Sequence, residues 1–262
     1  MSVDFVSALE GTVRIAAIGV GLTAMELVAD RQAFGPQGPF SAGVVSAIRG
    51  APGWLLVGPS AVVALASVQL AAAAILVAGG PLPVAGKLAL VIATVTTMAL
   101  RWRRSLGGDG AEQLTTIILV AATAAFVPTS SPSRAALAVA FVAGQSALAY
   151  VTAGIAKLVS PVWRDGSALP GILATYGHGH ARAAKLLRDH PLSGTVLGWS
   201  VMLFEAAFPA MLLAPYPVAL AAAMVGVSFH VGCAVLMGLN SFPWAFPATY
   251  LCLFAVRADL LG

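Results

Sequence analysis

Long apolar runs alternate with short polar connectors along the whole chain. Eight runs can be delimited, at 13–29, 54–78, 82–100, 113–128, 134–158, 194–214, 217–237 and 244–255, of which the last is the shortest. About twenty apolar residues are enough to cross a bilayer, and within lipid a helix satisfies its own backbone amides. The pattern predicts an all-α protein, a polytopic transmembrane helical bundle of about eight spans, with one domain covering residues 1–262.

Two connectors are longer and more polar than the others. Residues 30–53 hold several prolines and glycines, which fits either a loop or a broken interfacial helix. Residues 161–192 include an amphipathic stretch, with Arg182, Lys185 and Arg188 on one side and Leu186 and Leu187 on the other. We expect this second segment to lie along the membrane surface.

Composition supports a lipid environment. Hydrophobic residues make up 59% of the chain and charged residues 9%, and the mean hydropathy is +0.92, which leaves too little polar surface for a water-soluble globule. The net charge of +4 would suggest nucleic acid in a soluble domain, but the basic residues cluster in short connectors, where they act as topology signals. We expect a multi-pass protein of the cell membrane whose partner is the lipid bilayer and not nucleic acid.

The basic residues also predict an orientation. With eight spans, one side collects nine of them, namely Arg31, Arg49, Arg101, Arg103, Arg104, Arg164, Arg182, Lys185 and Arg188, and the other side holds Arg14, Lys87, Arg134 and Arg257. The positive-inside rule then places both termini outside the cytoplasm.

The cysteines and connector histidines do not form a metal motif. Cys233 and Cys252 lie in separate apolar runs without a CxxC or CxxH partner, and are expected to be buried apolar residues. The spacing of His178, His180 and His190 does not place three ligands on one helix face. We therefore predict no metal site.

Ionisable residues inside apolar runs are the candidates for chemistry, because each costs about 3 kcal/mol to insert at membrane depth. They are Glu26, Lys157, Glu205 and His230. Glu26 is close to Asp30 and Arg31, which favours a position at the interface.

Lys157 ends a long apolar run and shares a helix face with Ser146 and Tyr150, with the small residue Gly154 nearby. Desolvation favours the neutral amine, which is a usable base. A lysine that extends to the headgroups explains the same position equally well.

Glu205 and His230 occupy the middle of consecutive runs, so an antiparallel hairpin would bring them together. The carboxylate would then orient the imidazole. A hydrogen-bonded pair that only ties two helices together is an equal alternative.

The ordered motifs resemble the horizontally transferred transmembrane domain family, which shares its membrane module with vitamin K-dependent gamma-carboxylases. They are Tyr150-x-x-x-Gly154-x-x-Lys157-Leu158, Trp163-x-x-Gly166, Phe204-Glu205 with Pro209, Phe229-His230, and Phe242-Pro243-Trp244. An arginine-rich turn before Gly107-Gly108-Asp109 is similar to the bacterial members. The resemblance covers roughly residues 100–250.

The resemblance implies a quinol-linked enzyme with a reduced quinone of the vitamin K type as cofactor. Lys157 would be the base, Glu205 and His230 the other catalytic residues, and Tyr150, Trp163, Asp109 and Trp244 would shape the pocket. The carboxylases have an Asn-His pair where this sequence has Gly108-Asp109, and a large extramembrane region that binds the substrate. Specificity for a peptide or protein is therefore expected from a separate partner.

Two other functions remain open at this point. One is a non-enzymatic membrane partner in the maturation, export or immunity of a secreted peptide, in which Lys157 and Glu205 would only join helices. The other is a small transporter with a water-filled path past Glu26 or Glu205.

Overall fold

A computed structural model describes residues 3–50, 58–104, 108–128, 131–177 and 179–261. Within these ranges every regular element is a helix, which confirms the all-α prediction. The long helices are α1 (Phe5–Ala29), α3 (Pro59–Gly79), α4 (Val84–Arg104), α5 (Gly110–Phe126), α6 (Pro132–Val159), α10 (Pro191–Ala207), α11 (Tyr216–Met237) and α12 (Phe242–Leu261). Gly107, His178 and residues 54–57 lie outside the described ranges.

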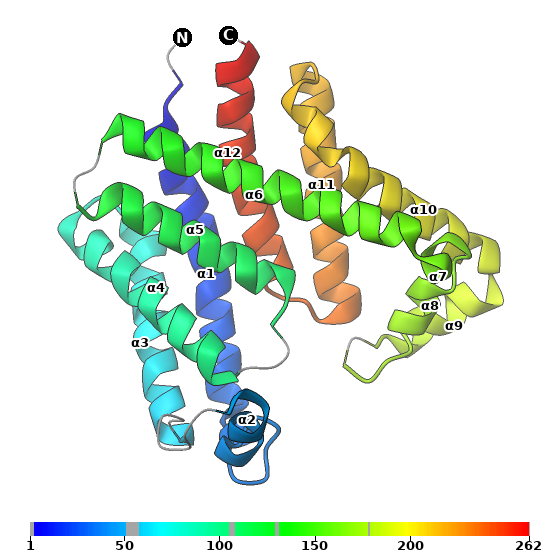
Figure 1. Cartoon of the computed structure of the whole chain (residues 1–262), viewed down its shortest axis with the longest axis horizontal. Helices are drawn as coiled ribbons and strands as arrows, with labels where there is room; N and C mark the ends of the chain where they lie inside the picture. The colour runs from blue at the N-terminus through cyan, green and yellow to red at the C-terminus, as the bar shows by residue number, and fades with distance from the viewer. Residues whose placement is uncertain (1–2, 51–57, 105–107, 129–130, 178, 262) are drawn as a thin grey trace.

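The eight apolar runs correspond to these eight helices. In the described part of the chain seven helical stretches are long and apolar enough to cross a membrane. One of them is α10 together with the 3-10 helix η3 (Phe208–Leu212) that continues it. The eighth helix, α5, is apolar but has only 17 residues. Such a length lies at the lower end for a span. Both termini lie at the same end of the molecule (Figure 1). The chain is a multi-pass membrane protein.

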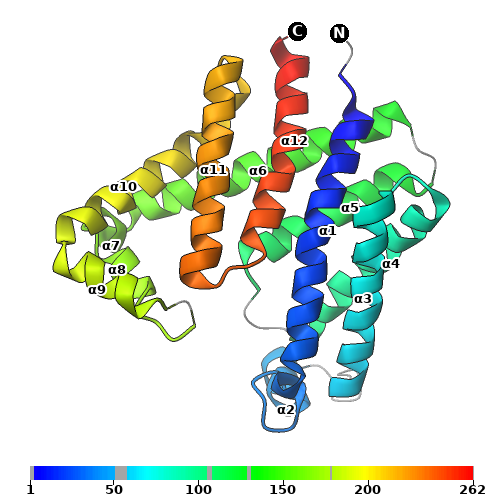
Figure 2. The same cartoon turned by 180° about the vertical axis from the view of Figure 1, so that it is seen from behind.

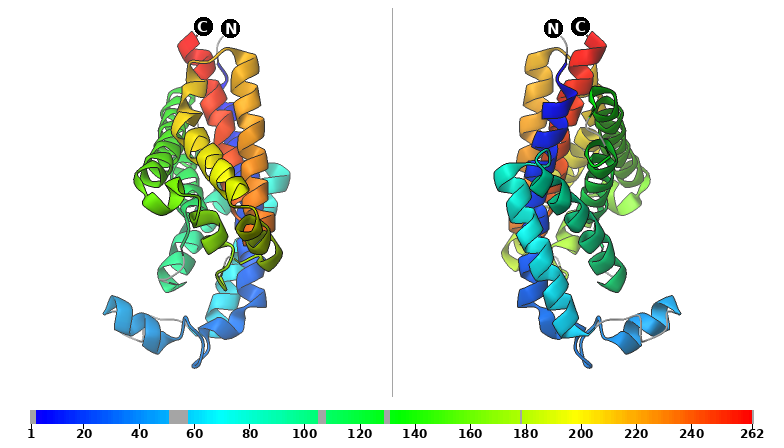
Figure 3. Two further views of the ribbon diagram at one scale, coloured as in Figure 1. Left: turned by 90° about the vertical axis from the view of Figure 1, so that its right-hand side faces the viewer. Right: turned by 90° about the vertical axis from the view of Figure 1, so that its left-hand side faces the viewer.

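The long helices form two layers. α1, α3, α11 and α12 run roughly side by side, and α5 and α6 cross them obliquely on one face (Figures 1 and 2). The side views in Figure 3 separate the two layers and show α2 (Ala42–Arg49) projecting from the end of the molecule opposite the termini. The bundle is therefore crossed and not simply antiparallel.

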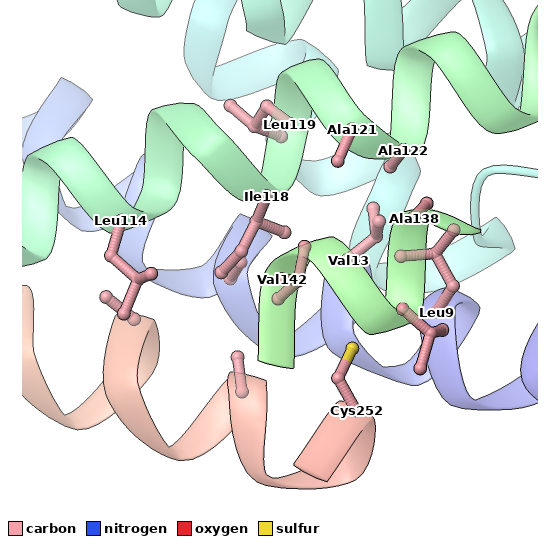
Figure 4. Packing of buried hydrophobic residues seen from close by; sticks show 14 of the residues in the cluster. Leu9, Val13, Leu114, Ile118, Leu119, Ala121, Ala122, Ala138, Val142 and Cys252 are labelled. Carbon is pink, nitrogen blue, oxygen red and sulfur yellow. The ribbon is translucent and has the colours of Figure 1, made fainter. Parts of the chain in front are cut away.

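The core lies where α1, α5, α6 and α12 meet. Leu9 and Val13 of α1, Ile118 of α5, Val142 of α6 and Cys252 of α12 pack together there (Figure 4). Many of the buried residues are alanine, which allows close helix packing in lipid. Large apolar side chains such as Leu88, Leu137 and Val235 point outward, as expected for surfaces that face lipid.

Hydroxyl groups inside the bundle join neighbouring helices. Ser146 of α6 and Thr249 of α12 share a hydrogen bond of 2.7 Å, and Thr94 of α4 and Thr123 of α5 share one of 2.9 Å. In lipid such bonds contribute about 0.6 to 2 kcal/mol each. They fix how each helix is rotated, and so decide which side chains face the space between the layers.

The two longer connectors contain short helices. The first holds the 3-10 helix η1 (Arg31–Phe34) and α2, so it is a broken helix where it is described. The second forms α7 (Pro161–Arg164), α8 (Ala168–Ile172) and α9 (Ala181–Asp189). On α9 Ala184 and Leu187 are buried, while Arg182, Lys185 and Arg188 are exposed, as the amphipathic pattern predicts. Leu186, expected on the apolar side, is 57% exposed, because it lies 100° around the helix from Leu187.

Candidate functional site

A cavity of about 600 Å³ lies between α5, α6, α10, α11 and α12, with α7 and α8 at one end. Its walls are mostly apolar and aromatic, with Phe229, Phe242 and Phe246 among them. Five of the seven site residues expected from the sequence line it, namely Tyr150, Lys157, Trp163, Glu205 and His230. Pockets for small ligands typically have this size and apolar character, with a few polar groups.

Lys157 and Glu205 form an ion pair inside the cavity. Lys157 Nζ donates a hydrogen bond of 2.6 Å to Glu205 Oε2, and the two side chains are 21% and 7% exposed. The ammonium also lies 5.3 Å from the centre of the Trp163 ring, within range of a cation–π contact. The lysine therefore faces a carboxylate and an aromatic ring rather than reaching for the headgroups.

Close packing of α6 against α10 makes this pair possible. A Cβ atom placed on Gly154 would come within 2.8 Å of Ala206 Cα, the residue next to Glu205. Only glycine permits this approach. The loop after α6 is held in the same way, because Gly166 has a φ of +84° and lies against Thr195 of α10, while Trp199 Nε1 donates to Arg164 O at 3.3 Å.

A second set of polar side chains, Tyr150, His230 and Tyr250, forms a hydrogen-bonded cluster beside the cavity. Tyr150 Oη is 2.6 Å from His230 Nε2 and 2.6 Å from Tyr250 Oη. The His230 ring stacks on Phe246 with centroids 4.3 Å apart and an interplanar angle of 7°. His230 Nδ1 is buried and has no hydrogen-bond partner among the described residues. Because a neutral imidazole has one donor and one acceptor nitrogen, either tautomer leaves Nδ1 unsatisfied.

The expected contact between Glu205 and His230 is not formed. Glu205 binds Lys157 of α6, and His230 binds Tyr150, which lies two turns earlier on the same face of that helix. The two residues line one cavity without pairing, because α6 supplies a partner to each. A hairpin of α10 and α11 alone would leave Glu205 and His230 to pair, but α6 packs beside both helices and changes the partners.

Two expected pocket residues lie outside the cavity lining. Asp109 caps α5, accepting from the Glu112 amide at 2.8 Å, and Ser241 donates to it at 3.3 Å. Trp244 packs against Gly19 of α1. Both residues position helix ends around the cavity without facing it.

The remaining ionisable candidates lie away from the cavity. Glu26 is exposed and accepts from Asn240 Nδ2 at 2.7 Å, while its position at the interface stays a prediction. His180 caps α9, its Nδ1 accepting from the Ala183 amide at 3.2 Å, and His190 follows the same helix. No group of three potential metal ligands occurs among the residues that the structure describes.

Sequence reasoning missed Cys233, Phe246 and Tyr250. Cys233 lies three residues after His230 and lines the same cavity, as helical spacing allows. Phe246 and Tyr250 are four residues apart on α12, which would have indicated one aromatic face. Gly226 of α11 makes room for Tyr250, since a Cβ there would lie 3.0 Å from Tyr250 Cζ.

Fold and cavity together define a class: a multi-pass helical membrane protein with an aromatic pocket that contains an ion pair and a histidine–tyrosine cluster. Comparisons with known protein families, with curated proteins and with solved structures found no match to this chain.

Proposed function

We propose that the chain is a membrane enzyme of the vitamin K-dependent gamma-carboxylase-like superfamily that takes a proton from a hydroxyl group of a reduced quinone. The observation that carries the proposal is the Lys157–Glu205 pair within an apolar cavity. Ion pairs at membrane depth are costly and are associated with function. The motif order from Tyr150 to Trp244 supports the same family.

The pair acts as one proton acceptor. It exists as ammonium and carboxylate, or as amine and carboxylic acid after one proton moves across the 2.6 Å bond. A ligand hydroxyl gives its proton to the carboxylate in the first form or to the amine in the second. Both routes end with a protonated Glu205, a Lys157 ammonium and a ligand oxyanion, which the ammonium stabilises.

The cavity suits a flat ring with oxygen atoms at both ends. Lys157 and Tyr150 are seven residues apart on α6, which is about 10 Å along the helix axis. His230, next to Tyr150, offers its unsatisfied Nδ1 as a partner for a second oxygen. Aromatic walls from Phe229 and Phe246 fit the faces of such a ring.

Quinone binding tests the proposal. The protein is purified gently, its lipids are extracted and quinones are measured by mass spectrometry, followed by titration with a dithionite-reduced naphthoquinone. We expect stoichiometric quinone in the wild type and about a tenfold or greater loss of affinity in Lys157→Met. Lys185→Met is the matched control, since Lys185 lies on α9 and pairs with Asp189 outside the cavity.

Lys157→Met leaves the Glu205 carboxylate unpaired, which could itself disturb the cavity. The double variant Lys157→Met/Glu205→Leu removes both charges and is therefore measured beside it. Equal quinone binding in all variants, or no quinone in the wild type, contradicts the proposal. A peptide or protein that copurifies in place of quinone would instead favour the non-enzymatic binding function.

A further inference from the structure

A second, smaller space with several polar side chains in its wall lies between α1, α3, α4 and α5, apart from the Lys157 cavity. Its volume is about 30 Å³, and none of its lining residues lines the larger cavity. Gln69 of α3, Arg104 of α4 and Glu112 of α5 contribute its polar groups, together with the hydroxyls of Thr23 and Thr115. The first turns of α5 separate the two spaces, with Glu112 on one side and Gln113 on the other.

One amide atom of Gln69 lacks a hydrogen-bond partner within the described ranges. Its side chain belongs to a residue that is 2% exposed, and Nε2 donates to Thr97 Oγ1 at 2.7 Å. Oε1 is buried without a hydrogen-bond partner among the described residues. Exchanging the amide nitrogen and oxygen would satisfy Oε1 and leave Nε2 unpaired, so one amide atom needs a ligand in either assignment.

Glu112 presents a second unsatisfied atom. Its Oε1 accepts from Arg104, while Oε2 is buried and has no hydrogen-bond partner in the described part of the chain. Two unsatisfied acceptors on residues that line one small space call for hydrogen-bond donors there. The arginines Arg101 and Arg104 on the same wall outnumber the single carboxylate, so a metal cation is disfavoured and a neutral donor fits.

We propose that this space binds ordered water, which bridges Gln69 and Glu112. A buried water needs roughly 10–15 Å³ and two to four polar partners, so about two molecules fit here. They donate to Gln69 Oε1 and Glu112 Oε2, and the threonine hydroxyls complete their hydrogen bonds.

The water reaches this site from the end of the molecule opposite the termini. An adjoining pocket of about 220 Å³ shares Thr23, Leu27 and Arg104 with it and extends to Glu26 and Asp30 at the exposed end of α1. Gln69 is the eleventh residue of the 21 in α3. The hydrated inlet therefore runs about 15 Å along α3 and ends near the middle of that span.

Hydroxyl-radical footprinting with a synchrotron X-ray pulse tests for this water, because radicals formed from bound water oxidise adjacent side chains. The full-length protein is used in lipid nanodiscs. Leu27 and Leu100 line the space and are 8% and 4% exposed, while Leu90 and Leu119 are fully buried elsewhere. We expect several-fold faster oxidation of the first pair than of the second.

The variant Gln69→Leu removes the amide and should lower oxidation of Leu100 to the level of Leu90, while Leu27, which also lines the outer pocket, should stay faster. Gln113→Leu, on the other side of α5, should leave the oxidation of Leu100 unchanged. Equal oxidation of all four leucines in the wild type, or unchanged oxidation in a folded Gln69→Leu, overturns the proposal. If Gln69→Leu does not fold, the comparison of leucines within the wild type still decides.

Discussion

The ammonium of Lys157 and the carboxylate of Glu205 lie 2.6 Å apart, although 48 residues separate them in the chain. Each is largely withdrawn from solvent, so each charge depends on the other. Removing one partner leaves a buried charge without compensation, whereas removing both does not.

This dependence predicts strong coupling in a double-mutant cycle. Lys157→Met or Glu205→Leu alone should lower the free energy of unfolding by about 3–5 kcal/mol, and the double variant should be close to the wild type. Thermal unfolding in detergent measures both. The exposed pair Lys185–Asp189 is the matched control, for which about 0–1 kcal/mol of coupling is expected. Additive effects of the two cavity mutations would show that the pair is not formed.

The close approach of α6 and α10 predicts a position-specific effect of added volume. Gly154→Ala should cost about 1–3 kcal/mol, because the new methyl group meets the backbone of Ala206. Gly144→Ala, ten residues earlier on α6, meets nothing within 4 Å and should be neutral or stabilising by up to about 1 kcal/mol. Chemical denaturation in mixed micelles compares the two variants, and equal effects would contradict the packing described here.

The two cysteines predict selective labelling. Cys233 lines the cavity and is partly exposed, whereas Cys252 is fully buried beside Thr12. N-ethylmaleimide should modify Cys233 much faster than Cys252, as peptide mass spectrometry would show. A ligand in the cavity should slow this reaction, while Cys233→Ser should abolish it. Modification of Cys252 at a similar rate would mean that the cavity is not the route of access.

The turn that carries Trp163 predicts a pH response. Hydrogen bonds from the Ser167 hydroxyl and then its backbone amide lower the pKa of Asp165 below its ordinary value of 3.8. Because the folded-state pKa is the lower one, the ionised carboxylate stabilises the turn above pH 3.8, and this stabilisation is lost as the pH falls through the folded pKa. Hydrogen exchange of residues 161–170, corrected for intrinsic rates, should therefore rise in acid. Asp165→Asn should show the faster exchange at every pH, and an identical pH response in that variant would refute the role of Asp165.

Much of the fold followed from the apolar pattern alone, because a spanning helix is specified by its own residues. The last helix is longer than predicted. The predicted run covers residues 244–255, whereas α12 covers Phe242–Leu261. Polar residues such as Arg257 interrupt the apolar pattern without ending the helix. Arg257 remains in the helix because its guanidinium donates to Ala214 O at 2.7 and 2.9 Å. Ala214 lies in the turn between η3 and α11, far from Arg257 in the chain, so the local sequence gives no signal for this contact.

The sequence predicted which residues line the candidate site, but not which of them contact one another. Ionisable residues within apolar runs are rare and can be recognised from the sequence, so Lys157, Glu205 and His230 could be named as candidates. Their pairing depends on how α6, α10 and α11 rotate against one another, and close contacts such as Gly154 with Ala206 set that rotation. The spacing of Phe246 and Tyr250 indicates a shared helix face but not what that face contacts, because an aromatic residue in an apolar helix is equally suited to face lipid.

The oblique course of α6 connects the site to the thickness of the membrane. Its 28 residues extend about 42 Å, against a hydrocarbon core of about 30 Å. Such a helix meets hydrophobic mismatch by tilting, and its tilt changes with the lipid. Because Tyr150 and Lys157 both lie on α6, a thinner or thicker bilayer shifts them against their partners on α10 and α11. The acyl-chain length of the lipid therefore changes the distances between the polar groups of the pocket.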